Sequence, residues 1–95
     1  MGEVIHNEDA HRFEANVDGG LARADYRRKG NLLEMFHTEV PRPDENRGVA
    51  AALVMAALGY ARRNGLAILP TCPYVRAYMR KHPETHDLLA RGARA

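Results

Sequence analysis

Three side chains of this sequence have the chemistry needed for acyl transfer: the thiol of Cys72, the imidazole of His37 and the carboxylate of Glu39. A thiolate can accept an acyl group and pass it to an amine, if a helix N-terminus or a cation lowers the thiol pKa. An imidazole can take the proton of an ammonium substrate before the amine attacks. His37 and Glu39 alternate along a strand-like segment, so they point to one face. Structural roles are the alternatives. Cys72 would be a small buried apolar residue, and His37 and Thr38 would hold the end of the strand in place by hydrogen bonds.

A glycine turn before a predicted helix is a second candidate site. Residues 47–51 read Arg-Gly-Val-Ala-Ala and lead into an alanine-rich segment. The N-terminus of a helix leaves backbone N–H groups unpaired and carries about half a positive charge, so it attracts phosphate groups. Gly48 lets a ligand approach the backbone, and Ala50 keeps that approach close. A tight turn without a ligand explains the same residues, because a short glycine motif is a weak signal.

Length and composition limit the class of protein. The 95 residues, 45% hydrophobic and 27% charged, are expected to form one globular domain over residues 1–95. No apolar run approaches the roughly 20 residues that span a bilayer, and the first residues lack a signal-peptide pattern. One cysteine forms no internal disulfide, which fits a reducing compartment. We therefore expect a cytoplasmic protein without a membrane partner.

The charged residues and the histidines argue against two further classes. The net charge is +2, the aromatic residues are two Phe and four Tyr, and the basic residues form no stripe. This composition is not that of a dedicated nucleic-acid binder. The five histidines lack the paired spacing of metal ligands, so we expect no metal.

The first half of the chain, to about Pro41, is predicted to form an antiparallel meander. Apolar residues recur there with a period of two, which is typical of half-buried strands. Short turn signals that contain glycine separate the segments. The expected strands cover residues 4–5, 13–17, 21–26 and 32–40, the last of them apolar enough for a central position.

The second half of the chain changes to a helical period. From Val49 the apolar positions recur in steps of three and four, and Gly65 ends this predicted helix. The short apolar segment 66–69 is expected to be a buried strand, parallel to the strand before the helix. Two short helices are expected beyond it, over 74–81 and 84–91. The predicted fold is therefore mixed α/β: an antiparallel meander, a βαβ crossover and short C-terminal helices.

Three blocks of the sequence together point to a family. They are His37-Thr38-Glu39-Val40-Pro41, then Arg47-Gly48-Val49-Ala50, then Pro70-Thr71-Cys72-Pro73-Tyr74-Val75. In this order and at this spacing they resemble the small, one-domain branch of the GNAT acetyltransferase superfamily. The similarity covers most of the chain, from about Phe13 to Pro83. It implies the GNAT-type fold, in which acetyl-coenzyme A enters a wedge where the two strands that flank the crossover helix splay apart.

The resemblance also implies roles for individual residues. The pyrophosphate loop aligns with residues 45–50, and Glu45 stands where the family has glutamine or arginine. A carboxylate there is expected to weaken coenzyme A binding, and Arg47 is expected to supply the missing positive charge. The superfamily generally uses direct attack by the amine, without an acyl-enzyme. The expected catalytic residues are Cys72, His37 and Glu39, and the expected cofactor-binding residues are Val40, Arg47, Gly48, Val49, Ala50, Ala51, Cys72, Pro73, Tyr74, Tyr78, Arg80 and Lys81.

The implied function is transfer of an acetyl group from acetyl-coenzyme A to a primary amine. A chain of 95 residues has few residues from which to build an acceptor pocket. The acceptor is therefore either a small amine held shallowly or a protein lysine or terminus that brings its own surface. One alternative is a coenzyme A or acyl-coenzyme A binding module with little catalysis. Another is a structural part of a dimer, which would need an apolar patch that the sequence does not locate.

Overall fold

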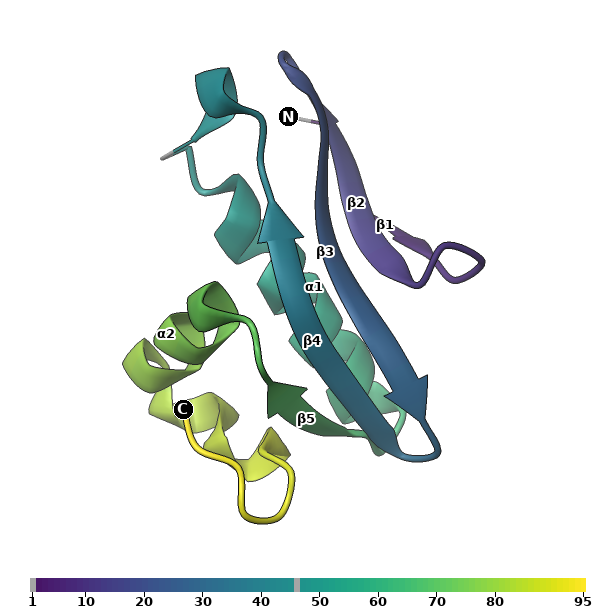
Figure 1. Cartoon of the computed structure of the whole chain (residues 1–95), viewed down its shortest axis with the longest axis vertical. Coiled ribbons are helices and arrows are strands. Elements are labelled where there is room, and N and C mark those ends of the chain that lie inside the picture. The colour runs from purple at the N-terminus through teal and green to yellow at the C-terminus, as the bar shows by residue number, and fades with distance from the viewer. Residues whose placement is uncertain (1, 46) are drawn as a thin grey trace.

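A five-stranded sheet forms the frame of the molecule, in a computed structural model that describes residues 2–45 and 47–95 (Figure 1). Its strands lie in sequence order, the first four antiparallel and the fifth parallel to the fourth. This confirms the predicted meander and crossover. The strands are β1 (Ile5–Asn7), β2 (Arg12–Val17), β3 (Gly20–Lys29), β4 (Leu32–Glu39) and β5 (Ala67–Pro70).

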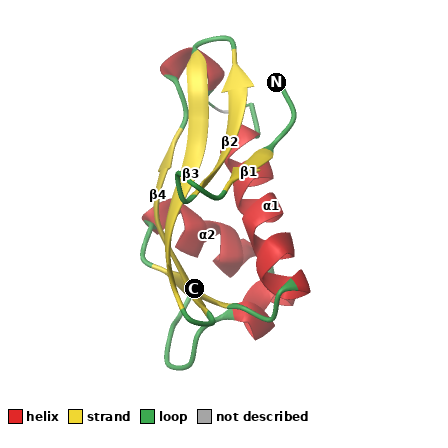
Figure 2. Cartoon of the chain, turned by 90° about the vertical axis from the view of Figure 1, so that its right-hand side faces the viewer, coloured by secondary structure: helices red, strands yellow, loops and turns green. Residues whose placement is uncertain are grey.

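The helices lie on one side of this sheet. Helix α1 (Val49–Arg63) connects β4 to β5 and packs against β2, β3 and β4. Figure 2 shows the sheet edge-on, with α1 on one side and the other face of β2 to β4 uncovered. Helix α2 (Pro73–Lys81) follows β5, as predicted. A short 3₁₀ helix, η1 (Arg42–Asp44), joins β4 to the start of α1. None of the helices that the structure describes is long and apolar enough to cross a membrane.

The final helix predicted over 84–91 is wrong in type and length. The segment forms a 3₁₀ helix, η2 (Pro83–Leu88), and then pairs with the sheet. Leu89 makes an isolated parallel bridge with Ile68, and the N–H of Ala90 donates to the carbonyl of Ile68 at 2.7 Å. Pairing with the open edge of β5 therefore competes with continuation of the helix.

The core lies between the sheet and α1. The helix face predicted from the spacing of apolar residues is buried: Val49, Leu53 and Ala57 are each 3% exposed or less. Leu33 of β4 and Ile68 of β5 face them from the sheet and are fully buried. The helix ends as predicted, because Gly65 takes a φ of +66° and lets the N–H of residue 66 donate to the carbonyl of residue 61 at 2.9 Å.

A bulge in β4 decides which face its last residues occupy. The register with β3 pairs Met35 with Tyr26 but His37 with Asp25, so Phe36 is an extra residue. Met35 faces the core, and without the bulge His37 would face it too. Instead the side chain of His37 is exposed on the uncovered face, and Thr38 pairs with the buried Ala24.

Candidate functional site

Strands β4 and β5 separate at a point that the backbone fixes. Their parallel register ends where Met35 pairs with Pro70, while β4 continues to Glu39. The N–H groups of Thr71 and Cys72 both donate to the carbonyl of Met35, at 3.1 and 2.9 Å. Over the described ranges, 2–45 and 47–95, β4 has no strand partner on that side beyond Met35. The result is a wedge whose apex lies at Cys72, between the end of β4 and the start of α2.

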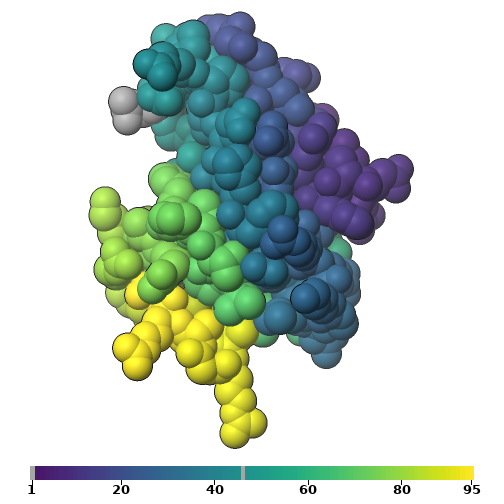
Figure 3. Space-filling model, in the orientation of Figure 1, coloured from purple at the N-terminus to yellow at the C-terminus, as the bar shows by residue number. Residues whose placement is uncertain are grey.

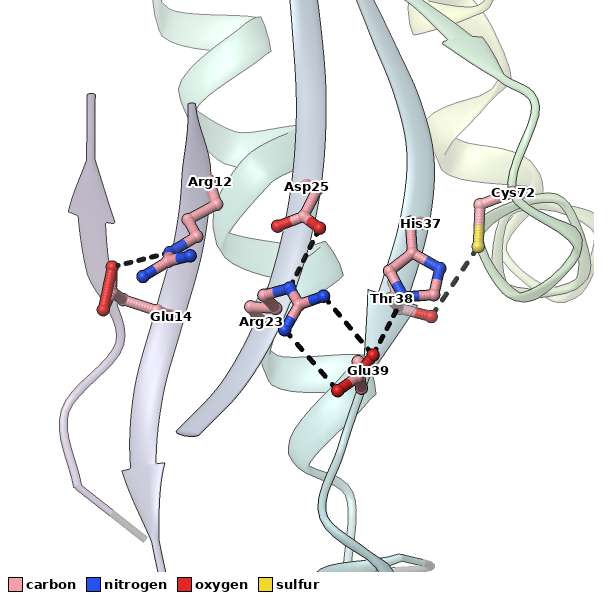
Figure 4. Close-up of polar contacts among 8 residues, drawn as sticks. All are labelled: Arg12, Glu14, Arg23, Asp25, His37, Thr38, Glu39 and Cys72. Carbon is pink, nitrogen blue, oxygen red and sulfur yellow. Dashed lines mark hydrogen bonds and ion pairs between the residues drawn. The ribbon is translucent and has the colours of Figure 1, made fainter. Parts of the chain in front are cut away.

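Cys72 lies at this apex and contacts β4. Its side chain is buried, at 4% exposure for the residue, and it occupies the N-cap position of α2. The sulfur lies 3.6 Å from Oγ1 of Thr38, as Figure 4 shows. Pro73 begins the helix that follows, and the N–H of Arg76 donates to the carbonyl of Cys72 at 3.0 Å. Cys72 therefore faces the wedge, whichever role its thiol has.

Thr38 is a site residue that was absent from the sequence-based candidates. The sequence gives its neighbours His37 and Glu39 a chemical role and Thr38 a structural one. The bulge at Phe36 turns these neighbours outward and Thr38 toward the wedge. The available signal was its place inside the His-Thr-Glu-Val block, but side-chain periodicity alone assigns the opposite face.

The start of α1 offers backbone donors beside the wedge. Gly48 is the N-cap with a φ of +76°, and no atom lies within 4 Å of where a β-carbon would stand. The first hydrogen bond of the helix is donated by the N–H of Ala52 to the carbonyl of Gly48, at 3.1 Å. The N–H groups of the first turn, at residues 49–51, have no intrahelical acceptor. The α1 N-terminus therefore has the open backbone predicted for an anion site.

A cavity of about 270 Å³ lies in front of this helix N-terminus. Its lining mixes apolar side chains, backbone and two carboxylates: Val40, Asp44, Glu45, Gly48, Val49, Ala50 and Tyr74. Five of the residues predicted to bind a cofactor are thus brought together, although they come from the segment after β4, the N-cap and first turn of α1, and α2.

The charges around this cavity differ from the expectation in one respect. The guanidinium of Arg47 lies 3.6 Å from a carboxylate oxygen of Asp18 and 3.8 Å from one of Asp44. Asp44 is buried and also accepts the N–H of Gly19 at 2.8 Å. Arg47 is therefore already paired, while Glu45 lines the cavity with an exposed carboxylate. Asn46, inside the predicted loop, lies outside the described residues.

His37 and Glu39 form a pair on the uncovered face of the sheet. Nε2 of His37 lies 3.2 Å from Oε1 of Glu39, which confirms that both point to one face. Arg23 of β3 contacts Glu39 at 3.3 Å and Asp25 at 3.0 Å (Figure 4). The hydrogen bond from His37, and then the charge of Arg23, lower the pKa of Glu39. The structure thus places this pair on the opposite face of β4 from Thr38.

A second cavity, of about 290 Å³, continues along α1 and α2. Tyr74 lines both cavities, so they are neighbours, and the two together are called the groove. Tyr78 and Lys81 also line the second cavity, and the ring of Tyr78 stacks on that of His82 at 4.1 Å. Desolvation raises the pKa of both tyrosines of this groove. Its lining is Ala51, Met55, Tyr74, Ala77, Tyr78, Lys81 and His82.

Four predicted cofactor residues do not line this groove: Arg47, Cys72, Pro73 and Arg80. Arg47 is paired with carboxylates, and Cys72 and Pro73 lie at the apex of the wedge, whereas Arg80 lies elsewhere on α2. Arg80 is exposed on α2, and Arg76, four residues before it, lines a different depression near the C-terminal end. A helix places residues four apart on one face, so Arg80 and Arg76 share a face other than that of Tyr74 and Tyr78.

The residues of the groove fit a long, partly apolar ligand with a phosphate-bearing end. The space at Gly48 would be filled by a β-carbon, and the amides of the first helical turn suit phosphate oxygens. Val40 and Tyr74 offer apolar contact, and Lys81 offers a cation further along. The carboxylate of Glu45 opposes phosphate binding, but it is exposed to solvent, which screens its charge.

The bulged β4, the wedge between β4 and β5, and the open N-terminus of α1, in this strand order, are features of the GCN5-related N-acetyltransferase fold. The family model of the GCN5-related N-acetyltransferases matches residues 12–88, and the chain belongs to this family.

Two relatives and one solved structure support the same assignment. The chain is 31% identical to Protein NATD1 of Gallus gallus in an alignment of 85 residues, and the match covers 85% of this chain and 76% of that protein. It is also 31% identical to Protein NATD1 of Homo sapiens, over 84% of this chain and 74% of that protein. A GCN5-like protein of Staphylococcus aureus, solved by NMR, superposes with a TM-score of 0.73 at 28% identity, over 93% of this chain and 87% of that one.

Proposed function

We propose that this protein transfers an acetyl group from acetyl-coenzyme A to a primary amine. The observation that carries the proposal is the wedge itself. An open helix N-terminus at Gly48, a groove along α1 and α2, and a polar apex at Thr38 and Cys72 lie next to one another. An acyl thioester with a phosphate-bearing tail needs these three features in this order.

The groove residues would hold the cofactor by its separate parts. The amides of residues 49–51 would bind the pyrophosphate, and Val40 and Tyr74 would contact the apolar arm. Tyr78 and Lys81 would contact the nucleotide end in the second cavity. When bound, acetyl-coenzyme A supplies a thioester carbonyl that is activated toward amines. Water is limited at the apex because Cys72 is buried and Thr38 is partly covered.

The acceptor amine would approach from the uncovered face of the sheet. His37 lies there, and its imidazole can take the proton that an ammonium group must lose before it attacks. Glu39 orients the imidazole through the 3.2 Å contact, and Arg23 holds Glu39 from the next strand. With the cofactor on one side of β4 and the base on the other, the amine would reach the thioester through the wedge.

Direct transfer to the amine is favoured over an acyl-enzyme. The thiol of Cys72 is buried, and among the described residues its hydrogen-bond partner is the neutral hydroxyl of Thr38, not a cation or a general base. A nucleophilic thiol needs such a partner to form a thiolate. Cys72 then acts as a small residue that shapes the apex.

A coenzyme A binding module with little catalysis is the second candidate function. Two observations favour it: Glu45 stands in the cavity, and the charge of Arg47 is directed to Asp18 and Asp44. Both would reduce affinity for a pyrophosphate group. An acetyltransferase and a binding module both bind coenzyme A, so only the measurement of acetyl transfer to an amine distinguishes them.

Mass spectrometry of the intact protein with acetyl-coenzyme A, followed by turnover assays on a panel of amines, tests the proposal. We expect an adduct under native conditions that is lost on denaturation, and release of free coenzyme A when an amine is added. An adduct without turnover on any amine would favour the binding module. A retained acetyl mass that disappears in Cys72→Ser would establish an acyl-enzyme. No adduct at millimolar cofactor would overturn both functions.

A further inference from the structure

A depression lined by two arginines lies beside the apex of the wedge. It has a volume of about 390 Å³ and is formed where the C-terminal segment folds back beside β5 and α2. Figure 3 shows this segment, in yellow, packed against the green surface around β5 and α2. The residues that matter are Thr71, at the end of β5, Arg76 of α2 and Arg94 of the C-terminal segment.

Two exposed arginines, Arg76 and Arg94, bring two positive charges to the lining of this depression. Within the described ranges, neither Arg76 nor Arg94 takes part in a salt bridge. Among the residues that the structure describes, no carboxylate side chain lines the depression; its other residues are Leu69, Pro70, Gly92 and Ala93. Arg23, Arg47 and Arg62 each have carboxylate partners. A planar guanidinium binds carboxylate or phosphate oxygens in pairs, so this lining suits an anionic group.

The depression lies on the acceptor side of the wedge. Leu69, which lines it, is in register with Glu34 of β4, whose side chain points to the same uncovered face as that of His37. Thr71 precedes Cys72 directly and donates its hydroxyl to Glu34 at 2.9 Å. Glu34 is also paired with Arg27, at 3.5 Å, so it already has a cationic partner. The two free guanidinium groups are thus next to the place where an acceptor would enter.

We propose that the acceptor carries a carboxylate or phosphate group close to its reactive amine, and that Arg76 and Arg94 bind this group. The inference rests on the proposed acetyl transfer, because it names the class of acceptor for the same site. An acidic residue or a phosphoserine beside an acceptor lysine has this chemistry. A carboxylate and a phosphate group differ in charge and shape, so the affinities of peptides that differ only in this group show which of them is bound.

The first measurement is direct binding, which does not depend on turnover. The probes are three short peptides with one lysine, flanked by glutamate, by phosphoserine or by glutamine. We expect the amide NMR signals of Thr71, Arg76, Gly92 and Ala93 to shift with the anionic peptides and not with the glutamine peptide. Arg76→Ala and Arg94→Ala should each abolish these shifts. The control, Arg63→Ala, changes an exposed arginine on α1 that lies outside the depression.

The second measurement is kcat/KM for acetylation of the same peptides. We expect an anionic peptide to be preferred over the glutamine peptide by about tenfold, the scale of one charge-assisted hydrogen bond. The preference should disappear in Arg76→Ala and Arg94→Ala, and it should persist in the control Arg63→Ala. If the peptides bind but none is acetylated, acetyl transfer fails and the anion site stands. Equal binding of all three peptides to the wild-type protein would overturn the anion site, whatever the turnover shows.

Discussion

Oγ1 of Thr38 and Sγ of Cys72 lie 3.6 Å apart across the wedge, although 34 residues separate them in the chain. Two backbone features bring them together. The bulge at Phe36 turns Thr38 toward the wedge, and the bonds from residues 71 and 72 to the carbonyl of Met35 fix the start of α2. The apex is therefore set by backbone geometry, and its side chains can be changed with little effect on its position.

Cys72→Ser tests the role of the thiol. Serine keeps a small polar group that can bond to Thr38, so we expect kcat to stay within about threefold of the wild-type value, as for a residue outside bond making. Cys72→Ala is the matched control, because it removes the polar group and keeps the small size. A loss of roughly a hundredfold or more in both variants would instead identify Cys72 as a nucleophile.

His37→Gln should lower kcat/KM by about 10²–10⁴, the usual contribution of a general base, and leave acetyl-coenzyme A affinity unchanged. The imidazole lies on the face opposite the cofactor groove, so cofactor binding does not depend on it. Steady-state kinetics and a cofactor titration on the variant measure the two effects separately. Unchanged turnover at every pH would place the base elsewhere.

Gly48→Ala should destabilise the protein and weaken cofactor binding. A non-glycine residue at a φ of +76° costs about 1–2 kcal/mol, and the added β-carbon enters the cavity in front of the helix N-terminus. Gly65→Ala is a close control, since its φ is +66° and its β-carbon would also meet open space, but it lies outside the groove. Urea unfolding should show similar losses in both variants, whereas a cofactor titration should show a loss only for Gly48→Ala.

His6 should make stability depend on pH. Burial lowers the pKa of His6, an effect partly offset by the charge of Glu8, and the ring bonds to the hydroxyl of Tyr26 at 2.6 Å and stacks on Phe13. A folded pKa below the unfolded value favours the neutral ring, so its contribution is present above the unfolded pKa and is lost as the pH falls through the folded pKa. The free energy of unfolding should therefore decrease from pH 7 to pH 5. His6→Phe should reduce this dependence, and an unchanged pH slope in that variant would contradict the assignment.

Leu53→Ala should lower the free energy of unfolding by about 2–5 kcal/mol, because Leu53 is fully buried between α1 and the sheet. Met55→Ala on the same helix should change it by no more than about 0.5 kcal/mol, because Met55 is 60% exposed. Urea unfolding of the two variants tests whether α1 buries the face that its sequence period predicts.

The regular parts of the fold were predictable because each follows from side-chain periodicity. The alternation of apolar residues with a period of two predicted the meander. The recurrence of apolar residues in steps of three and four from Val49 predicted α1, and Gly65 predicted where it ends. The C-terminal helix was not predictable from its own residues, since η2 gives way to pairing of Leu89 with Ile68 in a strand 21 residues earlier. Such long-range pairing leaves no local pattern in the sequence.

The candidate site was predictable by residue identity and less so by geometry. The groove brings together Val40, Gly48 and Tyr74, as the family resemblance implied. The alternation of apolar residues does not reveal the bulge at Phe36. Because this bulge turns Thr38 toward the wedge, the sequence did not identify Thr38 as a site residue. The partner of Arg47 was equally hidden, because Asp18 comes from a hairpin turn far from it in the chain.

The bulge in β4 also places neighbouring residues on two separate surfaces that can be substituted independently. Three consecutive residues point alternately to different environments: Thr38 to the wedge, and His37 and Glu39 to the open face. Substitutions on the open face therefore leave the side of β4 that faces the wedge unchanged. Under the proposed function, the acceptor surface and the acyl-donor surface of this short strand could then change independently of each other.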